Sequence, residues 1–88
     1  MTIYIAADHL GIKLKESLIK YLESNELDIK EIDLENSEYD DYCDFAFKLG
    51  RMVVSNKDSL GILICGNGIG MSIAANKVNG IRCARVVN

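Results

Sequence analysis

The chain has 88 residues, of which 49% are hydrophobic, and a net charge of −3, so it is long enough for one domain and too apolar to be disordered. Its 13 acidic residues against 10 basic ones argue against a nucleic-acid partner, because a phosphate backbone binds to a basic face. No apolar run approaches the ~20 residues that span a bilayer, so we expect no membrane partner.

The first part of the chain predicts a strand, a helix and a second strand. Residues 2–7 form a short β-branched and aromatic run that is typical of a strand. Residues 12–24 predict a helix with one apolar stripe. The stripe stands at positions i, i+4, i+7 and i+8 and consists of Leu14, Leu18, Tyr21 and Leu22. Residues 28–34 mix apolar and charged positions, as an edge strand does, and the acidic stretch 35–41 predicts a loop.

The second part continues the alternation of helices and strands. Apolar residues from Phe45 to Val53 predict a helix, and residues 60–64 predict a strand that is covered on both faces. A third helix is expected at about 70–78, with Asn79-Gly80 as its C-terminal cap, and a last strand at 81–87. The order β-α-β-α-β-α-β predicts an α/β fold with a parallel, four-stranded sheet and helices on its faces.

Two polar segments follow predicted strands at the edge where ligands of open α/β sheets bind. Asp8 and His9 come after the first strand, and residues 65–70, Cys-Gly-Asn-Gly-Ile-Gly, come after the third. Because parallel strands end at the same edge of a sheet, we expect the two segments to share one site. The alternative is that both are simply polar turns.

The glycine run after Cys65 lies between a strand and a helix, which favours a pocket for an anion or an oxyanion. It is neither a Walker loop nor a dinucleotide fingerprint. A thiol beside the start of a helix is a setting in which cysteines become reactive, although a buried structural role is the alternative. Cys43 and Cys83 have no such context and are interpreted as packing residues.

The thiols and the N-terminus also bear on location and metal binding. Three widely spaced cysteines resemble neither a disulfide framework nor a paired zinc site. Together with an N-terminus unlike a signal peptide, they favour the reducing cytoplasm. His9 is the only histidine, and no second ligand stands at helical spacing from it, so we expect no metal site.

Three motifs resemble the ribose-5-phosphate isomerase B family, which also contains the subunits of galactose-6-phosphate isomerase. They are the run from Ala7 to Gly11 with Leu14-Lys15, the run from Asp41 to Asp44 with Ala46, and the stretch from Gly61 to Arg82. The resemblance covers essentially the whole chain, and residues 1–88 are identified as a single sugar-phosphate isomerase domain. It implies a Rossmann-like three-layer sandwich that acts as a homodimer or homotetramer, with the active site shared between subunits.

The resemblance also implies a reaction and its residues. The reaction is aldose–ketose isomerisation, such as ribose 5-phosphate to ribulose 5-phosphate, through an enediolate and without any cofactor. Cys65 is implied as the base that moves a proton between C1 and C2. Asp8 and His9 are implied to contact the sugar phosphate, with His9 near the phosphate, and Tyr42 is a possible substrate contact. Backbone amides are implied to stabilise the enediolate oxygen, from Gly66, Asn67, Gly68, Ile69 and Gly70.

The chain departs from the family pattern in three ways. Asn67 replaces a threonine, Cys43 replaces a proline, and the family is longer, so the resemblance implies a chain truncated after its fourth strand. The part that would be missing carries a histidine that opens the sugar ring and arginines that bind the phosphate.

Two alternatives to a working isomerase remain. One is a phosphocysteine carrier that resembles the IIB domains of the sugar phosphotransferase system, whose loop pattern is met by Cys65, Gly68, Gly70 and Ser72. In those domains, however, the cysteine follows the first strand. The other is an inactive, truncated domain that only binds sugar phosphate or packs against a partner.

Overall fold

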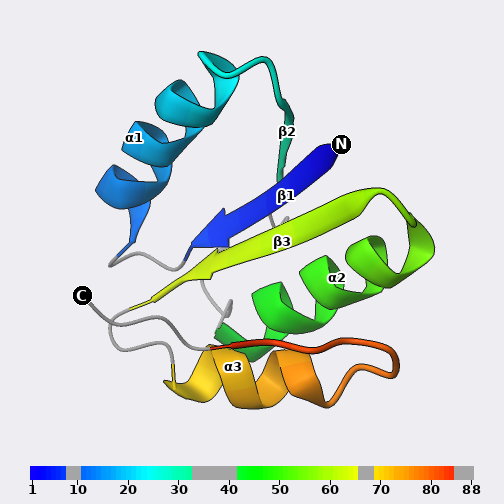
Figure 1. The fold of residues 1–88 in the computed structure, drawn as a ribbon. Helices are drawn as coiled ribbons and strands as arrows, with labels where there is room; N and C mark the ends of the chain where they lie inside the picture. Colours follow the sequence, from blue (N-terminus) through cyan, green and yellow to red (C-terminus); the bar gives the residue numbers. More distant parts are fainter. Residues whose placement is uncertain (8–10, 33–41, 66–68, 85–88) are drawn as a thin grey trace.

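The computed structural model describes residues 1–7, 11–32, 42–65 and 69–84, with the backbone alone for 42–44 and 69–71 (Figure 1). Strands and helices alternate along the chain, which confirms the predicted α/β fold. Their bounds are β1 (Thr2–Ala7), α1 (Ile12–Glu23), β2 (Asp28–Glu31), α2 (Tyr42–Ser55), β3 (Ser59–Ile64) and α3 (Ile69–Asn76). None of the described helices is both long and apolar enough to cross a membrane.

Within the described residues, the strands form a parallel sheet of three in the order β2-β1-β3. Thr2 pairs with Asp28 on one side and with Ser59 on the other, so the strands start at the same level. β2 lies at an edge, as its mixture of charged and apolar residues predicts. β1 is the central strand and is buried from Ile3 onwards.

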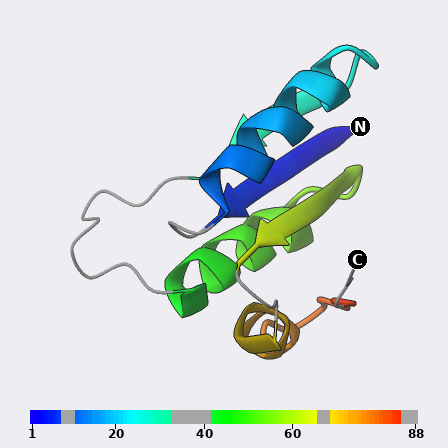
Figure 2. The ribbon, with the colours of Figure 1, turned by 90° about the vertical axis from the view of Figure 1, so that its left-hand side faces the viewer.

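The core is built on the two faces of β1. Tyr4 and Ala6 belong to a cluster with Leu49 of α2, whereas Ile5 and Ala7 belong to a cluster that includes side chains of α1. Successive side chains of a strand point to opposite faces, so α1 and α2 pack against opposite faces of β1. β1 and β3 lie between α1 and α3 in both views of the ribbon (Figures 1 and 2).

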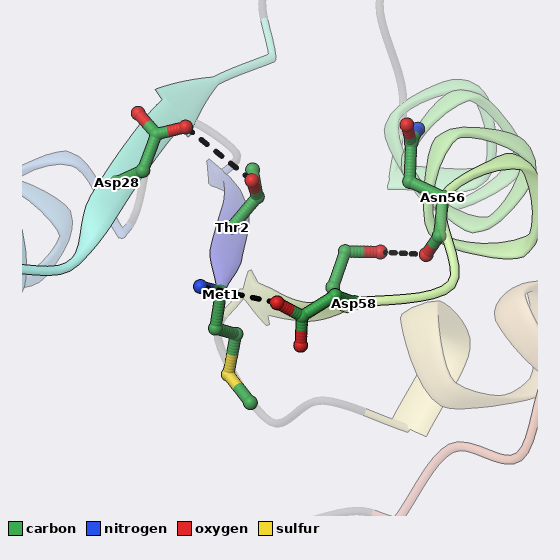
Figure 3. Close-up of polar contacts among 6 residues, drawn as sticks. Met1, Thr2, Asp28, Asn56 and Asp58 are labelled. Atoms are coloured by element: carbon green, nitrogen blue, oxygen red, sulfur yellow. Dashed lines mark hydrogen bonds and ion pairs between the residues drawn. The ribbon is translucent and has the colours of Figure 1, made fainter.

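Polar contacts join the amino ends of the three strands (Figure 3). The terminal amino group of Met1 lies 3.3 Å from a carboxylate oxygen of Asp58, and the hydroxyl of Thr2 donates a hydrogen bond of 3.3 Å to Asp28. The hydroxyl of Ser59 donates to the carbonyl of Asn56 at 2.6 Å. Each exposed contact of this kind contributes little to stability. The contacts lie at the level where the three strands start in register.

The predicted apolar stripe of α1 is wrong in part. Leu14 is 52% exposed and Tyr21 is 66% exposed, while Leu18 and Ile19 pack against the core. The side chain of Lys15 is largely buried, and its ammonium lies 3.2 Å from the carboxylate of Glu31 at the end of β2. The side of α1 that faces the sheet is therefore centred nearer to Lys15 and Ile19 than the apolar pattern predicts.

The strand expected at 81–87 is not found in residues 81–84, which pair with no strand, and residues 85–88 lie outside the described residues. The backbone of this segment forms hydrogen bonds with the side chain of Asn76 rather than with a neighbouring strand. Its Oδ1 accepts the N–H of Cys83 at 2.9 Å, and its Nδ2 donates to the Cys83 carbonyl at 3.0 Å. Ile81 and Cys83 pack against a cluster that includes Ala74 of α3, so this segment returns along α3 (Figure 1).

Smaller differences concern element ends. β2 ends at Glu31 and does not include Ile32, while residues 33 and 34 of the predicted strand lie outside the described residues; α3 covers 69–76 rather than 70–78. Gly80 has a φ of 90°, a conformation that glycine adopts readily, which agrees with a turn at that point. β3 was expected to be covered on both faces, but Leu60 is 55% exposed.

Ile5 and Ile73 give a matched test of the core. Ile5→Val removes a methylene from a residue with 0% exposure, so we expect the free energy of unfolding to fall by about 0.5–1.5 kcal/mol. Ile73→Val makes the same chemical change at a residue that is 56% exposed, and we expect a change within about 0.5 kcal/mol. Urea denaturation measures both. Equal losses would contradict the placement of the core on β1.

A second pair of variants tests the role of Asn76. The Nδ2 of Asn76 and that of Asn56 each donate to the carbonyl four residues earlier, at 2.8 Å in both cases. Only Asn76 also bonds to Cys83. Each net hydrogen bond contributes about 0.5–1.5 kcal/mol, so Asn76→Ala is expected to cost about 1–3 kcal/mol more than Asn56→Ala in urea denaturation. Equal costs would show that the bonds to Cys83 contribute nothing.

Candidate active site

The candidate site lies at the carboxyl edge of the sheet, where β1 and β3 end together. Ala7, the last residue of β1, pairs with Ile64, the last residue of β3. The segments that follow these two strands therefore start side by side. α1 and α2 both begin at the end toward which β1 and β3 point (Figure 2). This is the edge at which open α/β sheets bind ligands.

Gly11 brings the start of α1 into contact with the end of β3. A Cβ atom at Gly11 would lie 2.5 Å from Cγ2 of Ile64 and 3.1 Å from the Ile64 carbonyl oxygen. No side chain fits in that space, so glycine permits the backbone to approach this closely. The contact holds the segment that enters α1 against the residue that precedes Cys65.

Cys65 follows β3 directly and is half-buried. It is a thiol and not part of a disulfide. Four residues later, Ile69 begins α3, whose first turn carries backbone N–H groups without partners inside the helix and the positive end of the helix dipole. The chain therefore presents a half-buried thiol and the N-terminus of a helix on either side of one short glycine-rich segment.

The other predicted site residues fall into two groups. Ile69 and Gly70 form the start of α3, and Tyr42 is the first residue of α2. The remaining ones lie outside the described residues; these are Asp8, His9, Gly66, Asn67 and Gly68. The sheet register and the Gly11 contact bring the flanks of both segments together, with Ala7 and Gly11 on one side and Cys65 on the other.

Two residues with specific contacts received no role from the sequence. Lys15 forms the ion pair with Glu31, and Asn76 holds the segment around Cys83 against α3. An asparagine inside a helix is a weak signal, because its amide prefers to bond to backbone outside regular helix. Nothing in the sequence identifies the partner of Lys15. In the part of the chain that the structure describes, no group of three or more His, Cys, Asp or Glu residues is placed to hold a metal.

Comparison with known proteins gives one consistent result. The family described as Ribose/Galactose Isomerase matches residues 3–88. The probable ribose-5-phosphate isomerase B of Mycoplasma pneumoniae is 51% identical over 89 residues, which cover 98% of this chain and 57% of that protein. This chain thus spans little more than half the length of that relative.

Solved structures agree with the family match. Ribose-5-phosphate isomerase B of Clostridium thermocellum superposes with a TM-score of 0.82 at 42% identity, over 93% of this chain and 55% of that one. The Mycoplasma genitalium enzyme, solved with bound ribulose-5-phosphate, superposes with a TM-score of 0.81 at 41% identity, over 91% of this chain and 54% of that one. In sequence and in fold, the chain belongs to the ribose/galactose isomerase family.

Proposed function

We propose that this chain supplies the proton-transfer site of an aldose–ketose isomerase that acts on sugar phosphates. The observation that carries the proposal is the placement of Cys65 at the end of β3, beside the end of β1 and ahead of α3. Membership of the ribose/galactose isomerase family supports the reaction class. The relative from Mycoplasma genitalium, solved with ribulose-5-phosphate, supports a pentose phosphate as the first substrate to test.

The reaction requires a base and hydrogen-bond donors around the same few atoms. In the proposed step, the Cys65 thiolate removes a proton from C1 of the ketose, and the electrons of the C–H bond form the enediolate, with negative charge on the C2 oxygen. A proton passes from the C1 hydroxyl to the C2 oxygen, which leaves the negative charge on the C1 oxygen. The Cys65 thiol then returns its proton to C2, so that C1 becomes the aldehyde carbon of the aldose. Charge that develops on oxygen is stabilised by fixed donors, and we assign this role to the backbone amides of residues 66–70.

The remaining contacts are assigned from the family pattern. We propose that Asp8 and His9, which follow β1, bind the sugar phosphate, with His9 toward the phosphate. Tyr42 is proposed as a further contact because α2 begins at the same edge of the sheet (Figure 2). The proposed reaction uses no metal and no organic cofactor.

The complete protein is proposed to be larger than the part described. We infer a fourth parallel strand, a sheet with helices on both faces, and a homodimer or homotetramer in the cytoplasm. We also infer that the ring-opening histidine and the phosphate-binding arginines belong to the length of the relatives that this chain does not span.

A binding domain without turnover is the second candidate function. It is favoured by one observation, the coverage of only 57% of the Mycoplasma pneumoniae relative. The phosphocysteine carrier is disfavoured, because Cys65 follows the third strand rather than the first and because the family match is to isomerases.

Exchange of the C1 proton of ribulose 5-phosphate with D2O tests the proposal. The C5 hydroxyl of this ketose carries the phosphate and cannot close a ring, so the assay needs no ring-opening group. We expect NMR to detect exchange with the unchanged chain and with Cys83→Ser. A general base contributes about 10²–10⁴-fold, so Cys65→Ser is expected to slow exchange by that factor. Cys83 is a matched control, being half-buried and outside any disulfide as Cys65 is.

The other outcomes of the exchange assay distinguish between an isomerase without Cys65 as its base, a binding domain and a chain without a sugar-phosphate site. Exchange that survives Cys65→Ser would exclude Cys65 as the base. Absence of exchange in every variant, combined with changes in the amide spectrum on adding ribulose 5-phosphate, would favour the binding domain. Absence of both would contradict a sugar-phosphate site on this chain.

A further inference from the structure

The turn after α3 exposes an asparagine that is followed by a glycine. α3 ends at Asn76, and Asn79 and Gly80 lie in the turn beyond it, where both residues are exposed. The side-chain amide of an asparagine can be attacked by the backbone nitrogen of the next residue. Glycine has no side chain that hinders this approach. The pair Asn79-Gly80 therefore has the composition of a site at which the backbone modifies its own neighbour.

The side chain of Asn79 differs from those of the other asparagines that the structure describes. The amides of Asn25, Asn56 and Asn76 each donate a hydrogen bond of 2.8 Å to the carbonyl four residues earlier. The Asn76 amide also bonds to the backbone of Cys83. Within the described residues, the amide of Asn79 has no hydrogen-bond partner. No such bond opposes the rotation that would bring the amide carbon of Asn79 to the next nitrogen.

The nitrogen that would attack is accessible as well. In the part of the chain that the structure describes, the N–H of Gly80 donates no hydrogen bond. The backbone bond that spans the pair most closely runs from the N–H of Ile81 to the carbonyl of Val78, at 3.1 Å. Gly80 has a φ of 90°, which glycine adopts without steric cost. Rearrangement around Asn79 therefore has to open the bond from Ile81 and strains no side chain at Gly80.

We propose that Asn79-Gly80 is a modification site at which the folded chain deamidates without an enzyme. The deprotonated nitrogen of Gly80 attacks Cγ of Asn79 and forms a cyclic succinimide. The bond from Cγ to Nδ2 breaks, and ammonia leaves with the proton that the Gly80 nitrogen has given up. Water then adds to one of the ring's carbonyl carbons and opens the ring, which leaves aspartate or isoaspartate at position 79. No atom is oxidised or reduced.

The isoaspartate product changes the support of the segment after α3. Its main chain runs through Cβ, so the backbone between Asn79 and Gly80 gains one carbon atom. The Cys83 N–H lies 2.9 Å from Oδ1 of Asn76, and the Cys83 carbonyl lies 3.0 Å from Nδ2, across this turn. We infer that the longer turn weakens the hold of Asn76 on Cys83. This inference is independent of Cys65 and of the proposed function.

Ageing of the folded chain in mildly alkaline buffer, followed by tryptic mapping, tests the site. Trypsin cleaves on both sides of residues 78–82, in which Asn79 is the one asparagine. The other Asn-Gly pair, Asn67-Gly68, lies outside the described residues and falls in a different peptide. Mass spectrometry detects the replacement of an amide by a carboxylate, and chromatography separates isoaspartyl from aspartyl peptides. Asn79→Gln is the blank, because its longer side chain would have to form a larger ring. A sample digested without ageing corrects for reaction during digestion.

We expect Asn79 to deamidate in the folded chain, and faster as the pH rises, because the attacking nitrogen has to lose its proton. Opening one backbone hydrogen bond is expected to slow the reaction by roughly two- to tenfold relative to a synthetic peptide of residues 78–82. Asn25, Asn56 and Asn76 are expected to stay intact over the same time. No reaction at Asn79 beyond the blank, or reaction at Asn25 or Asn56 at the same rate, would overturn the proposal.

Hydrogen exchange of the Cys83 amide tests the consequence. The reference is Asn79→Asp, which carries the new charge on a main chain of normal length. We expect the Cys83 N–H to exchange roughly two- to tenfold faster in the isoaspartyl form than in this variant, as the loss of one hydrogen bond predicts. Equal exchange in the two forms would contradict a loosening by the longer turn.

Discussion

The in-register pairing of β1 with β3 is the constraint on which the rest of the structure depends. It lets the two strands end together at Ala7 and Ile64, and Gly11 then permits the chain entering α1 to pass against Ile64. Because of this contact, the start of α1, which follows the segment after β1, lies next to the residue that precedes the segment beginning with Cys65. A side chain at Gly11 would separate the two segments that the proposed chemistry brings together.

β1 contributes side chains to the core and also ends at the edge of the candidate site. β1 contributes Tyr4 and Ala6 to one apolar cluster and Ile5 and Ala7 to the other, so both faces of the sheet are anchored on it. A chain of this size buries only roughly 60–65% of the surface that its unfolded form exposes, and its stability is correspondingly small. Loss of packing around β1 is therefore expected to disturb the carboxyl edge, because β1 contributes to the core on both faces of the sheet that ends there.

Much of the fold could be predicted from local patterns, because the spacing of apolar residues and the glycine-containing turns indicate where strands and helices alternate. The position of Cys65 between a strand and a helix was also readable. The rotation of α1 about its own axis could not be predicted, because it is linked to the ion pair between Lys15 and Glu31, which are far apart in the sequence. The strand expected at 81–87 is not found in residues 81–84, because strand propensity alone does not specify a partner strand. In the described residues, the Asn76 amide bonds to Cys83.

The most direct test of a sugar-phosphate site at this edge is the ¹H–¹⁵N spectrum of the 88-residue chain during titration with ribulose 5-phosphate. The account predicts that the amide signals of Gly11, Cys65 and Ile69 shift together and saturate with one Kd. The signals of Thr2, Asp28 and Ser59, at the amino ends of the strands, are predicted to stay in place. Shifts confined to the amino ends, or a spectrum unchanged at saturating ligand, would contradict the account.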